Sequence, residues 1–487
     1  MKTRMGTGGV LAAAGVVGAL VALRFWKVGV FPVVGVDEGI WNFEARDLLL
    51  FGERSMNGFN NVFLSPLHFA TCWLLFHVAP ATCFSVRVFM GILGLVALGL
   101  VGVLVQRHRD RRTAFTAVLL IGFSFVMITV NRRAYLEGAM IVMSPVALLL
   151  AEGRSRGHRI AFAVCVAGML AYKSAAVYLL PALLIPAVGE TRRLLAQRLV
   201  SVVVGVALAI TILFLVARSA PELSGPAMLF ELSKSPGPEP LVRVGRFGVS
   251  LSAVGSAFRD LIVGQTDLAV LSGIAAVGFL ALRGWRDRFA LRVMAWLLCG
   301  YAFFLAQPNH PQYFAPLIVP AGILAALVTA GAPVGVRRWA PALLVASVTV
   351  FSLLRLGSGY RESLRSNPPA QVLAWLEQQG SGASSYLAAP EVVIASPRRG
   401  YAFNRIFHPL PPLVAPPLIP FLRTHGIRYI IFDQWETAVF FADDPRFHAA
   451  LARFDKVAAG DGWVAFDTRA VIGARSFAAP VSPRPHP

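Results

Sequence analysis

The sequence predicts an all-α polytopic membrane domain with about eleven transmembrane helices, followed by a small α/β domain. Three observations lead to this fold class. Hydrophobic residues make up 56% of the 487-residue chain and charged residues only 14%, whereas soluble proteins carry about 25% charged residues. Apolar runs of about 20 residues, the length of one helix across the hydrocarbon layer, recur along most of the chain. Beyond residue 357 they give way to short segments between prolines.

The apolar runs are expected to form the membrane helices. The first ends at Arg24 and Lys27 and lacks a small-residue cleavage site, which predicts a retained helix rather than a signal peptide. Two runs around Lys173 are together too short for two full spans, so we expect two short helices that meet there beside an outward-facing cavity. The expected helices cover 8–26, 86–106, 113–131, 138–152, 160–172, 174–189, 199–217, 267–283, 289–306, 312–331 and 340–357.

The segment 62–79 is apolar but ambiguous, and counting it as a span reverses the side of every later loop. It is short, is broken by Pro66 and contains His68 and His77, which suits a helix at the membrane surface. The clusters RHRDRR, RSRGHR and TRRLLAQR then fall on the cytoplasmic side, as the positive-inside rule requires. We therefore expect a bacterial inner-membrane protein with a cytoplasmic N-terminus and an extracytoplasmic C-terminal domain.

The net charge of +20 does not indicate a nucleic-acid partner. Its excess lies in short arginine clusters between apolar runs, which is the positive-inside pattern rather than a basic stripe. Membrane lipids are the partners that this pattern predicts. The four cysteines lack the spacing of a metal site.

The chain divides into a transmembrane domain over 1–357, an extracytoplasmic domain over 358–474 and a Pro-rich disordered tail over 475–487. Two long outer loops, 27–85 and 218–266, interrupt the first part.

The C-terminal domain combines a helical pattern with alternating segments. The helical pattern covers Ala370–Gln379, and alternation typical of strands covers Ser385–Ala389, Val392–Ala395 and Arg428–Phe432. This mixture predicts a small α/β domain.

The adjacent acids Asp37 and Glu38 follow the first helix in VGVDEGIWNFEARDLLLFGE. A solvated pair of loop acids is the simpler interpretation. However, the amphipathic segment that follows would hold both carboxylates at the membrane surface, where one of them could act as a general base on an acceptor hydroxyl or amine.

A second candidate is RRAYLE, at the expected outer end of a span. Arg132 and Arg133 lie on the wrong side for the positive-inside rule. Either Arg133 forms a helical ion pair with Glu137, four residues later, or its guanidinium binds an anionic headgroup. The sequence leaves both open.

Single polar residues also lie at expected outer helix ends: Arg87, Lys173, His310 and Tyr313. Each alone is explained as an interfacial anchor. Their convergence with Glu137 on the side that carries Asp37 favours a site, since ionisable groups near the bilayer are often functional.

The order of these motifs resembles the GT-C superfamily of glycosyltransferases that use polyprenyl-phosphate-linked sugars, near the protein O-mannosyltransferases and aminoarabinose transferases. The matching features are the acid pair in the first outer loop, Pro66-Leu67, Ser85-Val86-Arg87, RRAYLE, the run from Gly168 to Lys173 and HPQYFAPLIVP. The basic residue expected before Pro66 is missing, and the second acid is Glu rather than Asp.

The resemblance implies a role for each candidate residue. Asp37 would be the general base, with Glu38 and Glu137 as neighbouring acids. Arg87, Arg133 and Lys173 would bind the donor phosphate, while His68, His310 and Tyr313 would contact substrate. A divalent metal, if one is used, would bind Asp37 and Glu137.

The expected activity is transfer of a hexosyl or pentosyl group from a polyprenyl-phosphate donor to a lipid, glycan or protein acceptor of the cell envelope. A transporter or flippase of lipid-linked saccharides is the main alternative, and a non-catalytic scaffold of the same fold is a third. A transporter would need polar breaks deep in several helices, whereas the candidate residues here lie at helix ends.

Overall fold

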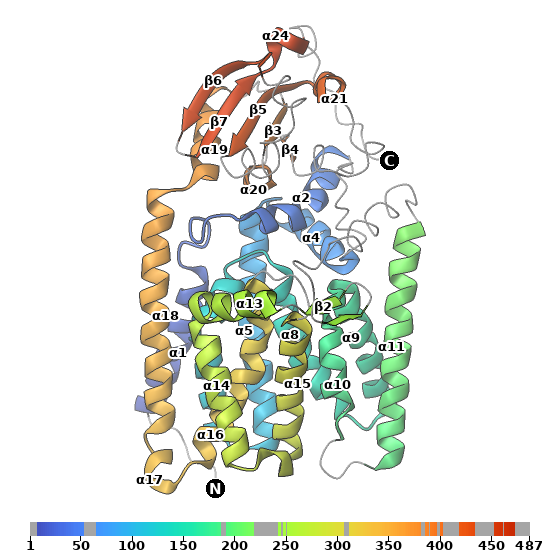
Figure 1. The fold of residues 1–487 in the computed structure, drawn as a ribbon, viewed down its shortest axis with the longest axis vertical. Helices are drawn as coiled ribbons and strands as arrows, with labels where there is room; N and C mark the ends of the chain where they lie inside the picture. Colours follow the sequence, from blue (N-terminus) through green and yellow to red (C-terminus); the bar gives the residue numbers. More distant parts are fainter. Residues whose placement is uncertain are drawn as a thin grey trace. The chain divides into compact units, whose positions relative to one another are not determined.

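The computed structural model is mostly helical and divides into two compact units (Figure 1). The first comprises Met1–Val28, Arg87–Leu213 and Ser233–Gly359, and the second comprises Gly29–Val86, Phe214–Leu232 and Tyr360–Pro487. The structure describes residues 7–52, 65–186, 191–218, 242–244, 247–249, 251–305, 311–380, 385–388, 390–396, 400–402, 418–433, 452–460 and 462–472. The expected tail at 475–487 and most of the loop at 218–250 lie outside these residues.

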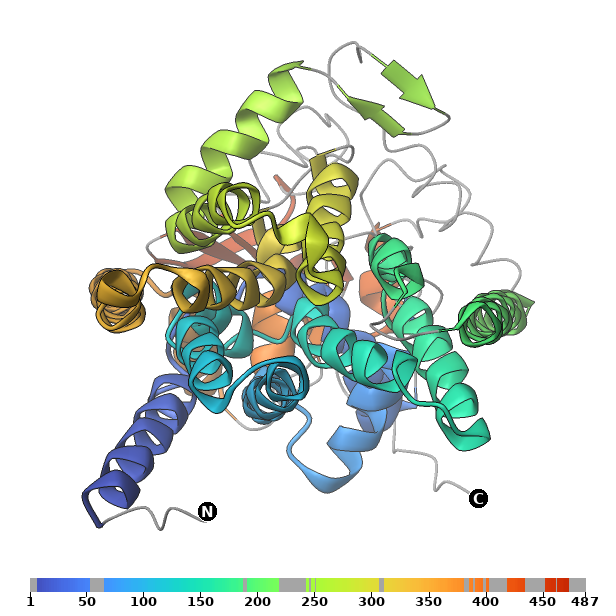
Figure 2. The same cartoon turned by 90° about the horizontal axis from the view of Figure 1, so that it is seen from below.

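The helices of the first unit coincide with the predicted apolar runs, and Figure 2 shows many of them end-on. Antiparallel strands β1 (Val242–Val244) and β2 (Phe247–Val249) precede α13. The helices are α1 (Thr7–Phe25), α5 (Cys83–His108), α6 (Arg111–Gly122), α7 (Phe125–Asn131), α8 (Leu136–Ala151), α9 (Arg156–Tyr172), η1 (Ser174–Leu179), α10 (Leu180–Leu184), α11 (Arg192–Arg218), α13 (Leu251–Gly264), α14 (Thr266–Ala281), η2 (Gly284–Arg286), α15 (Arg288–Leu305), η3 (Pro311–Leu317), α16 (Ile318–Gly331), α17 (Val334–Arg337) and α18 (Ala340–Arg365).

The expected single helix at 113–131 is instead two helices, α6 and α7, bent by 64°. The break has a side-chain cause. The Ser124 hydroxyl and the Val126 amide both donate to Oδ2 of the buried Asp267, at 2.5 and 3.2 Å. Ser124 also accepts from the Met127 amide and so caps α7. The apolar pattern did not reveal this break, because the acid comes from α14, more than a hundred residues later.

Five helical segments among the described residues are long and apolar enough to cross a membrane, and α6 with α7 makes a sixth if the bent pair is one span. Several others are shorter, including α8 and α14. The α4 helix (Pro66–Val78) has 13 residues, about 20 Å, which is less than the hydrocarbon thickness. Its placement at the surface and the total of eleven spans stay predictions.

The five arginine-rich loops of the first unit meet at one end of its helices, here called the basic end. They lie at 107–112, 154–159, 191–198, 283–288 and 337–338. Arg112 donates to the carbonyls of Arg337 and Arg338 at 3.2 Å. Arg109 forms an ion pair with Asp287. His108, Glu152, Ile185 and Arg292 connect the remaining loops through hydrogen bonds. This clustering agrees with loops on one side of a membrane; that this side is cytoplasmic stays a prediction.

Close packing around Gly94 gives a stability prediction. An added Cβ at Gly94 would overlap the Asn131 side-chain amide, which accepts a 3.1 Å hydrogen bond from the buried Arg24. We expect Gly94→Ala to destabilise the protein by about 1–3 kcal/mol through overpacking. Gly99→Ala, in the same helix with open space around the new Cβ, is the matched control. Thermal unfolding in detergent measures both, and equal midpoints would contradict the prediction.

The second unit contains a mixed five-stranded sheet in the order β4-β3-β5-β7-β6. Strand β3 pairs in parallel with β4 and β5, and β7 pairs antiparallel with β5 and β6. Helices cover both faces, which explains the nearly continuous apolar run in β5. The elements are α2 (Val36–Phe51), α4, α19 (Pro368–Gln378), β3 (Ser385–Ala388), α20 (Pro390–Ala395), β4 (Gly400–Ala402), α21 (Leu418–Thr424), β5 (Ile427–Asp433), β6 (Asp455–Gly460), β7 (Trp463–Asp467) and α24 (Arg469–Ile472).

One predicted strand is wrong. The segment Val392–Ala395 belongs to helix α20, which begins at Pro390. Proline at the first turn favours a helix start because its fixed φ is already helical. Its missing N–H costs no hydrogen bond there, since the first N–H groups of a helix have no partner within the helix. Val392 and Val393 are buried in the core beside Phe43 of α2. In addition, α18 continues to Arg365, so the predicted domain boundary at 357/358 falls inside a helix.

Candidate functional site

Three of the predicted site residues come together in the first unit. Lys173 forms an ion pair with Glu137 and lies 4.4 Å from the centroid of the Tyr313 ring. Glu137 stands in the first turn of α8, Lys173 ends α9, and Tyr313 belongs to η3. As predicted, the helical path breaks at Lys173, which has extended backbone and is followed by the 3-10 helix η1.

The two open explanations for RRAYLE are resolved in part. Glu137 pairs with Lys173 rather than with Arg133. Arg133 instead donates a 2.6 Å hydrogen bond to the Tyr135 hydroxyl, and its guanidinium lies 5.3 Å from that ring. Arg133 is only partly buried. The ion pair expected from helical spacing is therefore wrong, because the adjacent helix supplies a nearer cation.

The other arginine of RRAYLE has a structural role that the sequence did not show. Arg132 donates to the carbonyls of Leu23 and Trp26, each at 2.8 Å, and so bonds acceptors at the end of α1. Arg87, which is 1% exposed, donates to the Val28 carbonyl at 3.0 Å. Burial, and next the positive charge of Arg87, lower the pKa of Arg132 to about 10. The Arg132 guanidinium therefore stays charged at neutral pH and gives this region a positive potential.

In the second unit, Asp37 and Glu38 form the first turn of α2. Glu38 is fully buried, and its carboxylate accepts a 3.0 Å bond from the Gly35 amide at the start of the helix. Asp37 is half-buried. Acids at a helix N-terminus are favoured by the helix dipole. The first turn of α2 is therefore a favourable position for both negative charges, whether or not either acid is catalytic. The base function of Asp37 stays a proposal.

His68 is fully buried in α4. Its Nε2 lies 3.1 Å from Oδ1 of Asn42 in α2, and the same oxygen accepts from the Cys72 thiol at 3.1 Å. These contacts join α4 to α2 and give His68 a structural role. Substrate contact by His68 stays a prediction, and His310 lies outside the described residues.

The C-terminal sheet is connected directly to the helix that carries the acid pair. Phe43 of α2 is buried in one core with Tyr386, Tyr429 and Trp463 of the sheet. Arg46 is also fully buried and donates to the Ser396 carbonyl from Nε at 3.0 Å and from Nη2 at 2.7 Å. We name Phe43, Arg46 and Ser396 the α2 clamp. No sequence signal marked Arg46 for this role, because α2 carries several other charged side chains.

The α2 clamp gives a second stability prediction. Arg46 also pairs with the buried Asp47, so Arg46→Met removes charge-assisted hydrogen bonds from a buried carbonyl and a buried carboxylate. We expect a loss of about 1–3 kcal/mol, seen as faster proteolysis of the C-terminal domain. Arg365→Met, at an exposed position of α18, is the control. Equal proteolysis rates in the two variants would contradict the clamp.

The described residues do not form a metal site. No group of three or more His, Cys, Asp or Glu side chains among them is arranged to hold an ion. Glu137 already bonds an ammonium group and Glu38 a backbone amide. Metal binding by Asp37 and Glu137 stays a prediction.

Comparison with known proteins supports the fold. Residues 64–216 match the profile of the family described as dolichyl-phosphate-mannose-protein mannosyltransferase. ArnT from Cupriavidus metallidurans, solved bound to undecaprenyl phosphate, aligns with 98% of this chain and 100% of its own at 16% identity and a TM-score of 0.68. This chain has the ArnT fold.

A second solved structure agrees. The archaeal oligosaccharyltransferase AglB from Archaeoglobus fulgidus, solved with an inhibitory peptide and a dolichol-phosphate, aligns with 92% of this chain and 72% of its own at 12% identity and a TM-score of 0.51. A search of curated proteins found no match. The resemblance to GT-C glycosyltransferases drawn from the sequence is thus confirmed at the level of the fold.

Proposed function

We propose that this protein is a membrane glycosyltransferase that moves a sugar from a polyprenyl-phosphate donor to an acceptor of the cell envelope. The observation that carries the proposal is the ArnT fold over nearly the whole chain, because that structure holds undecaprenyl phosphate. The family match over residues 64–216 names the same class of donor, a polyprenyl-type lipid phosphate sugar.

The proposed reaction is a single displacement at the anomeric carbon of the sugar. An acceptor O–H or N–H attacks this carbon while the bond from carbon to phosphate oxygen breaks. Asp37 takes the acceptor proton as general base. The electron pair of the broken bond stays on the phosphate oxygen, so the lipid phosphate leaves with one more negative charge.

Cationic side chains would stabilise that growing charge. Lys173 is positioned by the carboxylate of Glu137 and by the Tyr313 ring, and Arg133 is held by Tyr135. Arg87 and Arg132 add positive potential from buried positions. Preorganised cations of this kind stabilise a transition state without having to move during the reaction.

The main alternative is a flippase for lipid-linked saccharides. The positions of the polar residues support transfer instead, since Glu137, Lys173 and Tyr313 lie at the ends of their helical segments rather than deep within them. We propose an extracytoplasmic location for this site and for the C-terminal domain, because the arginine-rich loops predict a cytoplasmic basic end.

Reconstituted full-length protein distinguishes the two functions. Proteoliposomes would receive a radiolabelled polyprenyl-phosphate sugar together with a cell-envelope extract. A transferase moves the label to an acceptor and releases polyprenyl phosphate in equal amount. Movement of intact donor across the bilayer, without cleavage of its sugar–phosphate bond, would contradict the proposal.

A further inference from the structure

A cavity of about 230 Å³ lies between α8, α9 and α11 at the basic end. Its polar wall includes Glu152, Arg154, Arg159 and Arg198. The apolar part of its wall includes Leu150, Phe162 and Leu194. A cavity with several cations beside apolar side chains has the chemistry of a site for an amphiphilic anion.

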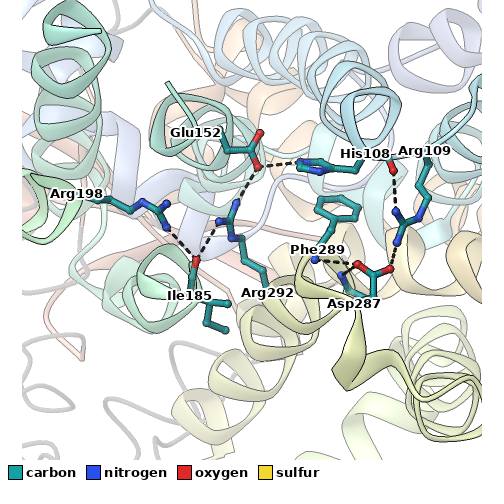
Figure 3. A network of polar contacts seen from close by, with 9 residues as sticks. His108, Arg109, Glu152, Ile185, Arg198, Asp287, Phe289 and Arg292 are labelled. Carbon is teal, nitrogen blue, oxygen red and sulfur yellow. Dashed lines mark hydrogen bonds and ion pairs between the residues drawn. The ribbon is translucent and has the colours of Figure 1, made fainter. Parts of the chain in front are cut away.

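Two arginines of this basic-end cavity, Arg159 and Arg198, are held in place by backbone carbonyls. Arg198 is 4% exposed, and its Nη1 donates to the Leu183 carbonyl at 3.0 Å. The same Nη1 donates to the Ile185 carbonyl at 2.9 Å (Figure 3). Arg159 donates to the Arg154 carbonyl at 3.0 Å, which holds these two residues together. Guanidinium groups so fixed lose little side-chain entropy when an anion binds.

The one acid in the wall does not cancel their charge, because it is already paired. His108 and Arg292 each lie 2.8 Å from Oε1 of Glu152 (Figure 3). The Glu152 carboxylate is therefore compensated by Arg292 and His108 rather than by the three arginines of the cavity wall. Arg154, Arg159 and Arg198 therefore leave the cavity with a net positive charge.

This cavity is separate from the proposed catalytic residues. Arg159 is near the beginning of α9 and Lys173 follows its end. Fourteen residues at 1.5 Å each place them about 21 Å apart along the helix. Likewise, Glu137 and Glu152 mark opposite ends of α8.

We propose that the basic-end cavity binds the phosphate group of an anionic glycerophospholipid. Arginine forks match phosphate oxygens, and basic pockets between membrane helices on the cytoplasmic side suit such headgroups. A lipid source is favoured over free phosphate because the cavity wall also carries the apolar side chains of Leu150 and Leu194, which would contact the glycerol and acyl chains of a lipid. This proposal does not depend on the glycosyltransferase activity.

The test compares purified full-length protein in nanodiscs of phosphatidylcholine alone, of phosphatidylcholine mixed with phosphatidylglycerol, and of phosphatidylcholine with added inorganic phosphate. Native mass spectrometry counts retained phosphatidylglycerol, and thermal unfolding reports stabilisation. We expect the mixed nanodisc to raise the unfolding midpoint and retain phosphatidylglycerol. Stabilisation by inorganic phosphate alone would assign the cavity to a free anion instead and overturn the lipid source.

Two double variants separate the cavity from general attraction of basic loops to anionic lipid. Arg154→Gln with Arg159→Gln should weaken phosphatidylglycerol retention about tenfold or more, the size of one lost charge-assisted hydrogen bond. Arg192→Gln with Arg193→Gln removes the same charge from exposed positions outside the cavity wall and should retain it. Equal losses in both pairs, or no loss in either, would overturn the proposal.

Discussion

Replacing Asp37 with Asn is expected to reduce sugar transfer by about 10²–10⁴-fold, the usual contribution of a general base. The amide keeps the size of the side chain and its position in the first turn of α2, but it cannot accept the acceptor proton at neutral pH. Because the donor phosphate is bound by other side chains in the proposed reaction, the loss should appear in kcat. The KM for the polyprenyl-phosphate sugar should change little. The measurement is label transfer in proteoliposomes.

Two further variants make this assignment specific. Glu38→Gln keeps an acceptor for the Gly35 amide, so this bond at the helix start survives and a much smaller loss is expected. Asp455→Asn, at an exposed position of β6, controls for the chemical change itself. Full activity of the Asp37 variant, or a larger loss in the Glu38 variant, would mean that Asp37 is not the base.

Replacing Lys173 with Met should lower kcat by about 10²–10³-fold, the effect of removing one preorganised group that stabilises transition-state charge. The variant also leaves the buried Glu137 without its ammonium partner, which adds a repulsive charge where the phosphate would leave. Single-turnover measurements with labelled donor separate this loss from weaker donor binding.

A merely structural role for Lys173 predicts a different result. Lys173→Arg keeps the cation and should restore part of the activity, whereas Lys456→Met, on an exposed strand position, should leave activity unchanged. If both Lys173 variants fold as well as the parent protein and transfer sugar at its rate, the phosphate-contact assignment fails.

The fold followed from the sequence where one physical effect dominated. Long apolar segments must become helices in a bilayer, because only helices satisfy their backbone groups there without water. The predicted runs therefore coincide with α5, α11 and α15. The helix–strand choice at Val392–Ala395 failed, because short apolar segments fit either structure and burial against α2 decided between them.

Three of the candidate residues, Glu137, Lys173 and Tyr313, lie together in the structure, but their contacts were not predictable. Helical spacing suggested a pair between Arg133 and Glu137, yet Lys173 supplies the cation. Arg132, which the positive-inside rule marks as misplaced, bonds carbonyls at the end of α1. Contacts between segments a hundred residues apart leave no periodic trace in the sequence.

The sequence by itself determined that the chain is a membrane protein, where its helices run, and which polar residues stand at their ends, because hydropathy and charge act locally along the chain. Only the tertiary structure decided that the C-terminal sheet holds α2 through Arg46, that Asp267 breaks the span at Ser124, and that arginines from separate loops line one cavity. These features depend on close packing and on the pairing of buried polar groups, which bring together residues whose separation in the chain carries no information about their contact.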